Sequence, residues 1–359
     1  MSLSDFGWNE HFKEHFEPHA GEGLIPGRVA AEHRGAYAVY TEDGDRSAEL
    51  AGRLRHDALE RNDLPAVGDW VVLQPLPEGR AVVHAVLPRL SKFSRTVASD
   101  QHRVSGEQVL AANVDTVFLV TSLNHDLNAR RLERYLVTAW ESGAAPAILL
   151  NKADLCPAEE RTALLAEVEA VAFGVPVHTV SAVTGEGLEE LEAYLAPGRT
   201  VVLLGSSGVG KSTLVNRLAG RELLATQEIR SDGRGRHTTS HRELVILPGG
   251  GLVLDTPGLR ELQLFEGSEG MDEAFEDVAS LASECRFSDC AHESEPGCAV
   301  AAAIADGTLP PERLESYRKL QRELERVERK RDARLQSEYR SKWRRFAREQ
   351  RARPKPRRR

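Results

Sequence analysis

The sequence contains no uninterrupted apolar run of about 18 residues, the length that a helix needs to cross a bilayer. Its first residues, MSLSDFGWNEHFKEHFEP, also lack the basic start and apolar stretch of a secretory signal. We therefore expect no membrane partner and a cytoplasmic location. With 41% hydrophobic and 28% charged residues, the composition is that of an ordinary globular protein.

Cysteine is scarce and unevenly placed. Cys156 stands alone, and we interpret it as a buried thiol. The other three cysteines share a short segment with one histidine: Cys285, Cys290, His292 and Cys298. In a cytoplasmic chain this spacing favours metal binding over disulfides. Three thiolates and one imidazole suit tetrahedral Zn²⁺ with no open position, so we predict one structural zinc ion. The alternative is a set of buried free cysteines.

The net charge of −8 hides a strong asymmetry. Residues 340–359 hold eleven Lys or Arg and one acid, Glu349, which gives this tail a charge of +10 and the rest of the chain −18. The sequence therefore predicts an acidic body with a disordered basic tail. At 359 residues the body is long enough for two or three domains.

Five short strands predict a first domain over residues 26–95. Residues 1–25 show no periodicity, and we expect them to form a mobile extension. The strand segments that follow are GRVAA, AYAVYT, AELAGRL, DWVVLQP and RAVVHAVL, separated by turn residues. This pattern favours an OB-like β-barrel, although other small barrels fit it as well.

We interpret the polar segment 90–108 as a linker. The sequence pattern changes after it. Apolar strands and helices alternate over residues 105–268, which predicts a doubly wound α/β domain. The strands expected there are Val114–Thr121, Pro146–Leu150, Pro176–Val180, Thr200–Leu204 and Gly251–Leu254. Residues 269–339 are predicted to form a mostly helical domain around the metal cluster.

One segment of the α/β domain matches the GxxxxGK[ST] pattern of phosphate-binding loops, between a predicted strand and a predicted helix. Glycines let several backbone N–H groups point at the phosphates, Lys211 reaches the β- and γ-phosphates, and Ser212 binds Mg²⁺. The alternative is a chance glycine-rich turn. The residues predicted to bind nucleotide here are Gly205, Ser206, Ser207, Gly208, Val209, Gly210, Lys211, Ser212 and Thr213.

A second motif, Asn151-Lys152-Ala153-Asp154, follows the strand PAILL. The Asp154 carboxylate can accept hydrogen bonds from N1–H and the 2-amino group of guanine, for which adenine has no matching donors. Lys152 can pack along the base, and Ser181-Ala182 resembles the loop whose backbone N–H contacts guanine O6. The motif therefore predicts GTP as the ligand; an ATP-dependent enzyme is the alternative.

The segment Asp255-Thr256-Pro257-Gly258 follows another apolar strand. Asp255 is placed to hold Mg²⁺, and the Gly258 N–H can sense the γ-phosphate. A threonine from the glycine-rich segment before it would complete the Mg²⁺ shell, and Thr238 and Thr239 both qualify.

Many GTPases orient the attacking water with a glutamine directly after this segment, but Leu259 stands there. His237 is the nearest polar side chain with a suitable pKa range for catalysis. The alternative is that His237 is an ordinary histidine in a surface loop.

The order of the motifs is the reverse of the usual one, because Asn151–Asp154 precedes the phosphate loop. The domain is therefore predicted to be circularly permuted, which chain termini that lie close together allow. As a consequence, the segment after Gly258 runs directly into the metal-binding domain.

Together, the barrel, the permuted motifs and the Cys-x4-Cys-x-His-x5-Cys cluster resemble the RsgA family, GTPases that depend on the small ribosomal subunit. The resemblance covers roughly residues 25–310. It implies an OB-fold, a zinc domain with the four ligands above, and His237 as catalytic residue. It also implies binding to the small subunit and its rRNA in late maturation, with stimulated hydrolysis of GTP to GDP and phosphate. We expect a monomer.

Leu259 leaves room for another reading, a non-catalytic RNA-binding module that uses GTP as a structural ligand. The basic tail is likewise open to two interpretations. It is either a solvated end or an arm attached to rRNA phosphates, and only the latter predicts a steep salt dependence of particle binding that deletion of 340–359 would reduce.

Overall fold

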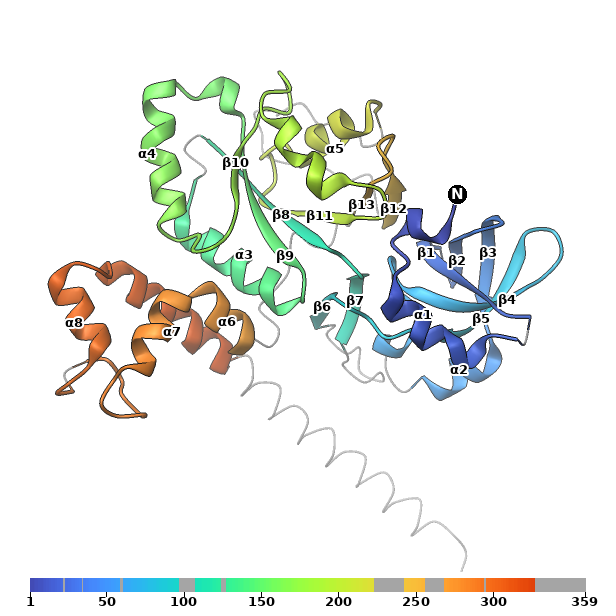
Figure 1. Ribbon diagram of the computed structural model, residues 1–359, viewed down its shortest axis with the longest axis horizontal. Coiled ribbons are helices and arrows are strands. Elements are labelled where there is room, and N and C mark those ends of the chain that lie inside the picture. The colour runs from blue at the N-terminus through green and yellow to red at the C-terminus, as the bar shows by residue number, and fades with distance from the viewer. Residues whose placement is uncertain are drawn as a thin grey trace, which may run out of the picture.

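The computed structural model describes residues 1–21, 23–33, 35–58, 61–96, 107–123, 127–222, 242–255, 268–293 and 295–326. Within these ranges the chain forms a β-barrel, an α/β domain and a group of short helices (Figure 1). The basic tail at 340–359 lies outside them. None of the helices described is long and apolar enough to span a membrane.

Five strands form the barrel: β1 (Ile25–His33), β2 (Ala36–Thr41), β3 (Gly44–Leu50), β4 (Trp70–Pro75) and β5 (Arg80–Val86). They are hydrogen-bonded in the order β1-β2-β3-β5-β4, and β1 also pairs with β4, which closes the barrel. Side chains alternate along β2, so that Tyr37 and Val39 join Val71 and Leu73 in the barrel core. The predicted five-stranded barrel is confirmed. A short helix, α2 (Gly52–Asp57), follows β3.

The N-terminal residues are folded onto the barrel, and the expectation of a mobile extension is wrong for residues 1–21. They form a 3₁₀ helix (Leu3–Phe6) and helix α1 (Glu10–Phe16), whose first turn is capped by the Asn9 side chain. Phe6 and Phe12 are buried in a cluster with Trp70 of β4. The apolar residues belong to two short helices separated by a turn, so they do not follow a single helical repeat along the sequence.

Truncation of Phe12 is expected to destabilise the barrel. Phe12 is 1% exposed, so Phe12→Ala leaves a cavity beside Trp70 and lowers the free energy of unfolding by about 3 kcal/mol. Equilibrium denaturation with urea measures this loss. Glu14→Ala, an exposed change on the same helix, serves as control and should stay within about 0.5 kcal/mol of the parent. Equal stabilities of the two variants would contradict the packing role.

Six strands form the sheet of the α/β domain: β8 (Thr116–Ser122), β9 (Ala145–Asn151), β10 (Val177–Thr179), β11 (Thr200–Leu204), β12 (Glu243–Ile246) and β13 (Leu252–Asp255). Their order is β10-β9-β8-β11-β13-β12, and neighbours are parallel except for β12 and β13. Strand β11, which precedes the phosphate loop, therefore lies inside the sheet. One neighbour, β8, comes earlier in the chain, and the other, β13, comes later.

Both faces of this sheet are covered. Along β8, Val117 and Leu119 belong to the core that contains α3 (Ala129–Glu141) and α4 (Ala158–Glu169). Phe118 and Val120 point to the opposite core, which contains α5 (Lys211–Ala219) and a 3₁₀ helix at Leu188–Leu195. The predicted doubly wound domain is confirmed.

The barrel and the α/β sheet are continuous. Strand β1 pairs with β12 at Ala31 and Glu243, and the Tyr40 hydroxyl donates to the Leu244 carbonyl at 3.0 Å. The polar segment expected to be a linker carries strand β6 (Lys92–Thr96), which pairs with β7 (Glu107–Ala112). The linker interpretation is therefore wrong for residues 92–96.

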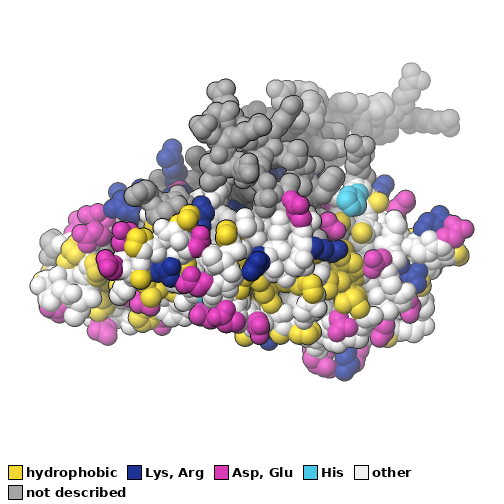
Figure 2. All heavy atoms as spheres, turned by 90° about the horizontal axis from the view of Figure 1, so that it is seen from above, with side chains coloured by type: hydrophobic (Ala, Val, Ile, Leu, Met, Phe, Trp, Pro, Cys, Tyr) yellow, Lys and Arg dark blue, Asp and Glu magenta, His cyan; other side chains and the backbone are white. Residues whose placement is uncertain are grey.

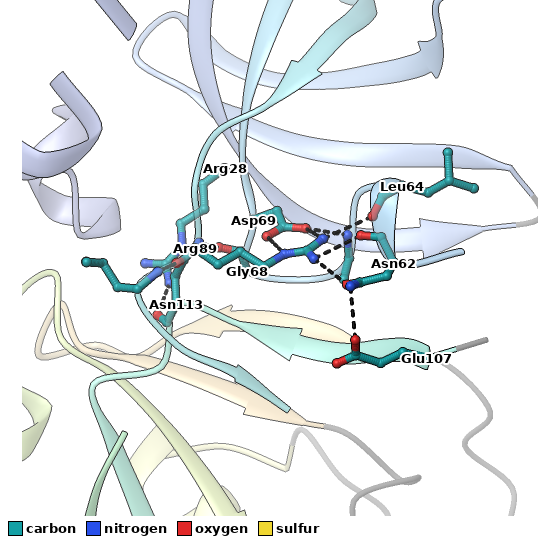
Figure 3. A network of polar contacts seen from close by, with 10 residues as sticks. Arg28, Asn62, Leu64, Gly68, Asp69, Arg89, Glu107 and Asn113 are labelled. Carbon is teal, nitrogen blue, oxygen red and sulfur yellow. Dashed lines mark hydrogen bonds and ion pairs between the residues drawn. The ribbon is translucent and has the colours of Figure 1, made fainter. Parts of the chain in front are cut away.

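Two buried charges, Arg28 and Asp69, lie in a polar network next to this junction (Figure 3). Arg28 of β1 is 1% exposed and donates to the Gly68 and Asn113 carbonyls at 3.3 and 2.8 Å, while burial lowers its pKa to about 10. Asp69 is fully buried and accepts two hydrogen bonds from Arg89, at 2.8 and 2.7 Å. Because a buried charge is costly unless its bonds are made, the bond from Arg28 to Asn113 favours one arrangement of the barrel and the α/β domain, whereas the Asp69–Arg89 pair lies within the barrel segment.

The C-terminal helices are α6 (Ser268–Ala274), α7 (Glu276–Ser283), α8 (Ala299–Asp306) and a helix over residues 311–326. Arg313 joins them to α3, because its guanidinium bonds Glu133 at 2.8 Å and Asp277 at 2.9 Å and lies 4.1 Å from the Phe275 ring centre. Gly270 allows close contact of α6 with α3, since a Cβ there would lie 2.5 Å from the Val137 carbonyl oxygen. On the face drawn in Figure 2, acidic and basic side chains are interspersed across the described surface.

Candidate nucleotide site and metal centre

The phosphate-loop segment connects the end of β11 to the start of α5. Two of its glycines meet immediate neighbours: a Cβ at Gly205 would lie 2.1 Å from the Val120 carbonyl oxygen, and one at Gly210 would lie 2.4 Å from Asn151 Nδ2. Gly208 and Gly210 also have positive φ angles, of 84° and 99°. The loop can therefore take this course only with glycine at these positions.

The other predicted phosphate-binding residues lie around the same turn. Val209 is buried, and Ser212 and Thr213 lie in the first turn of α5, at the positive end of the helix dipole. Lys211 Nζ donates to the Gly205 and Ser206 carbonyls at 2.7 and 2.6 Å, so its ammonium group lies against the loop. This arrangement of backbone N–H groups and one cation is suited to a polyphosphate.

Asn151 links the phosphate loop to the predicted base-reading residues. Its side chain is buried at the end of β9, where Nδ2 donates to the Val209 carbonyl at 2.8 Å and Oδ1 accepts from Ala182 N–H at 3.0 Å. A single amide therefore sets the spacing between the phosphate loop, the Asn151–Asp154 segment and the Ser181-Ala182 turn. Three segments that are distant in sequence meet at one point, as the motifs require.

Asp154 lies at the surface beside this junction and accepts a 2.6 Å hydrogen bond from the Ser181 hydroxyl at one oxygen, Oδ1. Lys152 adopts a left-handed backbone conformation, with φ of 65°, which turns the chain so that Ala153 N–H bonds the Val180 carbonyl. A carboxylate oxygen has two lone pairs, so Asp154 keeps acceptor capacity for the two donors on the edge of a guanine ring.

The predicted switch residues are only partly described. Asp255 ends β13, whose neighbour β11 leads into the phosphate loop, so its backbone lies near that loop. Gly258 lies outside the described residues, as do His237, Thr238 and Thr239.

The second predicted site brings its four residues together. The ligand atoms of Cys285, Cys290, His292 and Cys298 all lie within 4.8 Å of one another. His292 Nδ1 is 3.5 Å from both the Cys285 and Cys298 sulfurs, which are 3.9 Å apart. Tetrahedral zinc, with bonds of about 2.3 Å to sulfur and about 2.0 Å to nitrogen, requires separations of about 3.8 and 3.5 Å. The cluster therefore fits a tetrahedral metal ion.

Local structure prepares these ligands. Cys298 is the N-cap of α8 and accepts from Ala301 N–H at 3.3 Å, while His292 has a φ of 59° that brings its ring back to the cysteines. Burial raises the pKa of the Cys285 thiol, but hydrogen bonds from the N–H groups of Val300 and Ala299 and from the neighbouring cysteines lower it, and the net shift is downward, whereas burial raises the pKa of Cys290 to about 11. A lowered pKa favours the thiolate that a metal binds.

One group beside the nucleotide site could not be found from motifs. Arg161 of α4 bonds the Ala153 carbonyl of one predicted base-reading segment and the side chain of Glu186, which follows the other segment, Ser181-Ala182. No sequence motif includes Arg161, because an arginine near the start of an exposed helix cannot be distinguished by sequence from an ordinary solvated side chain.

Comparison with known proteins identifies the family. A model of the RsgA GTPase family matches residues 86–265. The protein named small ribosomal subunit biogenesis GTPase RsgA from Opitutus terrae is 49% identical to the chain over 98% of both. The chain belongs to the RsgA family. A relative of the same name from Syntrophotalea carbinolica is 50% identical over 90% of each chain. A further model, described as a 50S ribosome-binding GTPase, matches residues 200–333.

Two solved structures match the chain over most of its length. The crystal structure of YjeQ from Thermotoga maritima matches with a TM-score of 0.65 and 30% identity, over 84% of this chain and 98% of that one. YloQ, described as a circularly permuted GTPase, matches with a TM-score of 0.62 and 26% identity, over 86% and 97%. The chain is thus an RsgA GTPase with a circularly permuted α/β domain.

Proposed function

We propose that this RsgA GTPase binds the small ribosomal subunit and its rRNA and acts in the late maturation of that particle. In this proposal it hydrolyses GTP to GDP and phosphate, the subunit stimulates the reaction, and the chain acts as a cytoplasmic monomer. Relatives named for small-subunit biogenesis share about half of all residues over nearly the whole length, which supports the partner as well as the activity.

The observation that carries the proposal is the pair of hydrogen bonds that the Asn151 side chain makes, donating to the Val209 carbonyl and accepting from Ala182 N–H. They set a fixed distance between the loop proposed to hold phosphates and the turn proposed to hold the base. Guanine would contact Asp154, with Lys152 along its plane. Since both ends of the nucleotide are bound by a preorganised site, little binding energy is lost to ordering the loops.

The proposed metals have separate roles. The Cys₃His cluster, whose spacing fits tetrahedral coordination, would hold one structural Zn²⁺ and join the end of α7 to the start of α8. Ser212, Asp255 and either Thr238 or Thr239 would hold Mg²⁺, which supplies charge neutralisation for the transferred phosphoryl group. Lys211 would bind the β- and γ-phosphates, and the Gly258 N–H would sense the γ-phosphate.

Leu259 cannot position water, so we propose His237 as the residue that does. His237→Ala is expected to lower kcat at saturating small subunits by about 10²-fold, with little change in KM for GTP, because a group that acts on water contributes mainly in the transition state. Steady-state phosphate release measures both constants. His84→Ala, on the barrel, is the control. Unchanged kcat for His237→Ala would leave His237 an ordinary surface histidine.

The proposed partner is tested by GTP turnover with isolated small subunits, large subunits and naked rRNA at equal concentrations. Strong stimulation by small subunits alone is expected. The alternative, a non-catalytic RNA-binding module, rests on Leu259 and predicts particle binding with GTP but no increase in turnover. Stimulation by naked rRNA to the same level would contradict recognition of the assembled particle.

A further inference from the structure

Arg161 connects the two segments that the proposed function assigns to base reading. It lies in the second turn of α4, and all three guanidinium nitrogens are engaged. Nε donates to the Cys156 carbonyl at 2.9 Å, Nη2 donates to the Ala153 carbonyl, and Nη1 bonds Glu186 Oε1 at 2.7 Å. Two of these partners flank Asp154 in sequence, and the third belongs to the segment after Ser181.

Glu186 carries the effect of Arg161 to the second segment. Its side chain is held by Arg161, and its backbone carbonyl accepts from Ser181 N–H at 2.9 Å. Ser181 in turn donates its hydroxyl to Asp154 at 2.6 Å. A continuous path of bonds therefore leads from Arg161 through Glu186 and Ser181 to the carboxylate that would face guanine.

The shape of the guanidinium group explains why an arginine is suited to this position. Its donors lie in one rigid plane, so a single side chain can fix two carbonyls and a carboxylate at defined angles. Arg161 and Glu186 are 29% and 47% exposed. An ion pair this exposed contributes little to global stability, so its loss should change local geometry more than folding.

We propose that Arg161 is a positioning residue for guanine selectivity, acting through Glu186 and Ser181 on the orientation of Asp154. The proposal rests on the proposed reading of guanine by Asp154. Inosine diphosphate is the informative probe, because its base lacks the 2-amino group and so offers Asp154 one donor fewer than GDP. Misplacing the carboxylate should therefore weaken GDP binding more than inosine diphosphate binding.

The test uses fluorescence titration of the full chain with GDP and inosine diphosphate, without ribosomal particles. Arg161→Met keeps the aliphatic stem and removes the donors; it should raise Kd for GDP about tenfold and narrow the preference for GDP about threefold. Glu186→Gln should act in the same direction, and the double variant should show less than the sum of the two effects. Arg199→Met, which removes an exposed ion pair with Asp115 elsewhere in the domain, is the control and should change neither quantity.

Two results would overturn the proposal. One is a Kd for GDP within about twofold of the parent in Arg161→Met. The other is an equal loss of affinity for both nucleotides, which a merely structural role would produce. Neither result would contradict the proposed subunit-stimulated GTPase function. Tight GDP binding by an Asp154→Asn variant, in contrast, would contradict the proposal that Asp154 recognises guanine.

Discussion

Asp154→Asn is expected to raise Kd for GDP by about 10³-fold or more, because an amide presents a donor where guanine also presents donors. The same variant should gain affinity for xanthosine diphosphate, whose base has a carbonyl in place of the 2-amino group. The oxygen of the introduced amide would accept from N1–H, and its NH₂ group would donate to that carbonyl. The Ser181 hydroxyl can donate to either side chain, so the loop should keep its course.

Titration with GDP, xanthosine diphosphate and ADP measures this change of preference. Glu159→Gln removes an exposed carboxylate at the start of α4, close to Asp154 in sequence, and is the matched control. Its nucleotide preference should be that of the parent. If Asp154→Asn leaves GDP binding unchanged, Asp154 does not recognise the base, and the result would favour the alternative of an ATP-dependent enzyme.

Much of this site was predictable because its chemistry depends on residue type at fixed spacing. Glycines in a phosphate loop and cysteines around a metal are constrained by contacts within a few residues, so the local pattern is sufficient. The continuous run of apolar residues around Val117–Val120 also predicted a strand that is buried on both faces of the sheet, as observed. The order of the motifs then predicted the permutation.

Other features depend on contacts that sequence spacing does not encode. The packing of Phe6 and Phe12 depends on Trp70, which is distant in the chain. Strand β6 pairs with β7 across residues 97–106, and its polar side chains resemble those of a linker. The segment AELAGRL predicted one strand, but β3 ends at Leu50 and α2 begins at Gly52, where the chain leaves the barrel. Tertiary partners decided each of these cases.

The permuted order gives the C-terminal helices a direct connection to the nucleotide site. Strand β13 ends at Asp255, and the described chain resumes at α6, which contacts α3 at Gly270. Arg313 and Glu133 are each 3% exposed, so breaking their ion pair would leave an unpaired buried charge. The segment that carries Gly258 is therefore attached at both ends to well-packed structure.

The metal cluster should be required for the C-terminal fold to persist. Helices α7 and α8 have eight residues each, and isolated helices shorter than about 12 residues are marginal in water. Cys285 lies directly after α7 and Cys298 caps α8, so a bound ion would join the two helices where each needs support.

Cys290→Ala is therefore expected to reduce bound zinc from one ion per chain to a small fraction, because three ligands replace four and a structural site contributes about 10 kcal/mol or more to folding. Amide protection should fall in α7 and α8, while Kd for GDP changes little because Val209 of the phosphate loop and helix α5 pack on the opposite face of the sheet from α7 and α8. Metal analysis and hydrogen exchange measure the two effects. Cys156→Ala, which removes the buried thiol outside the cluster, is the matched control and should retain the metal. Full protection of α7 and α8 in the metal-free variant would mean that the Arg313 ion pairs alone maintain the domain.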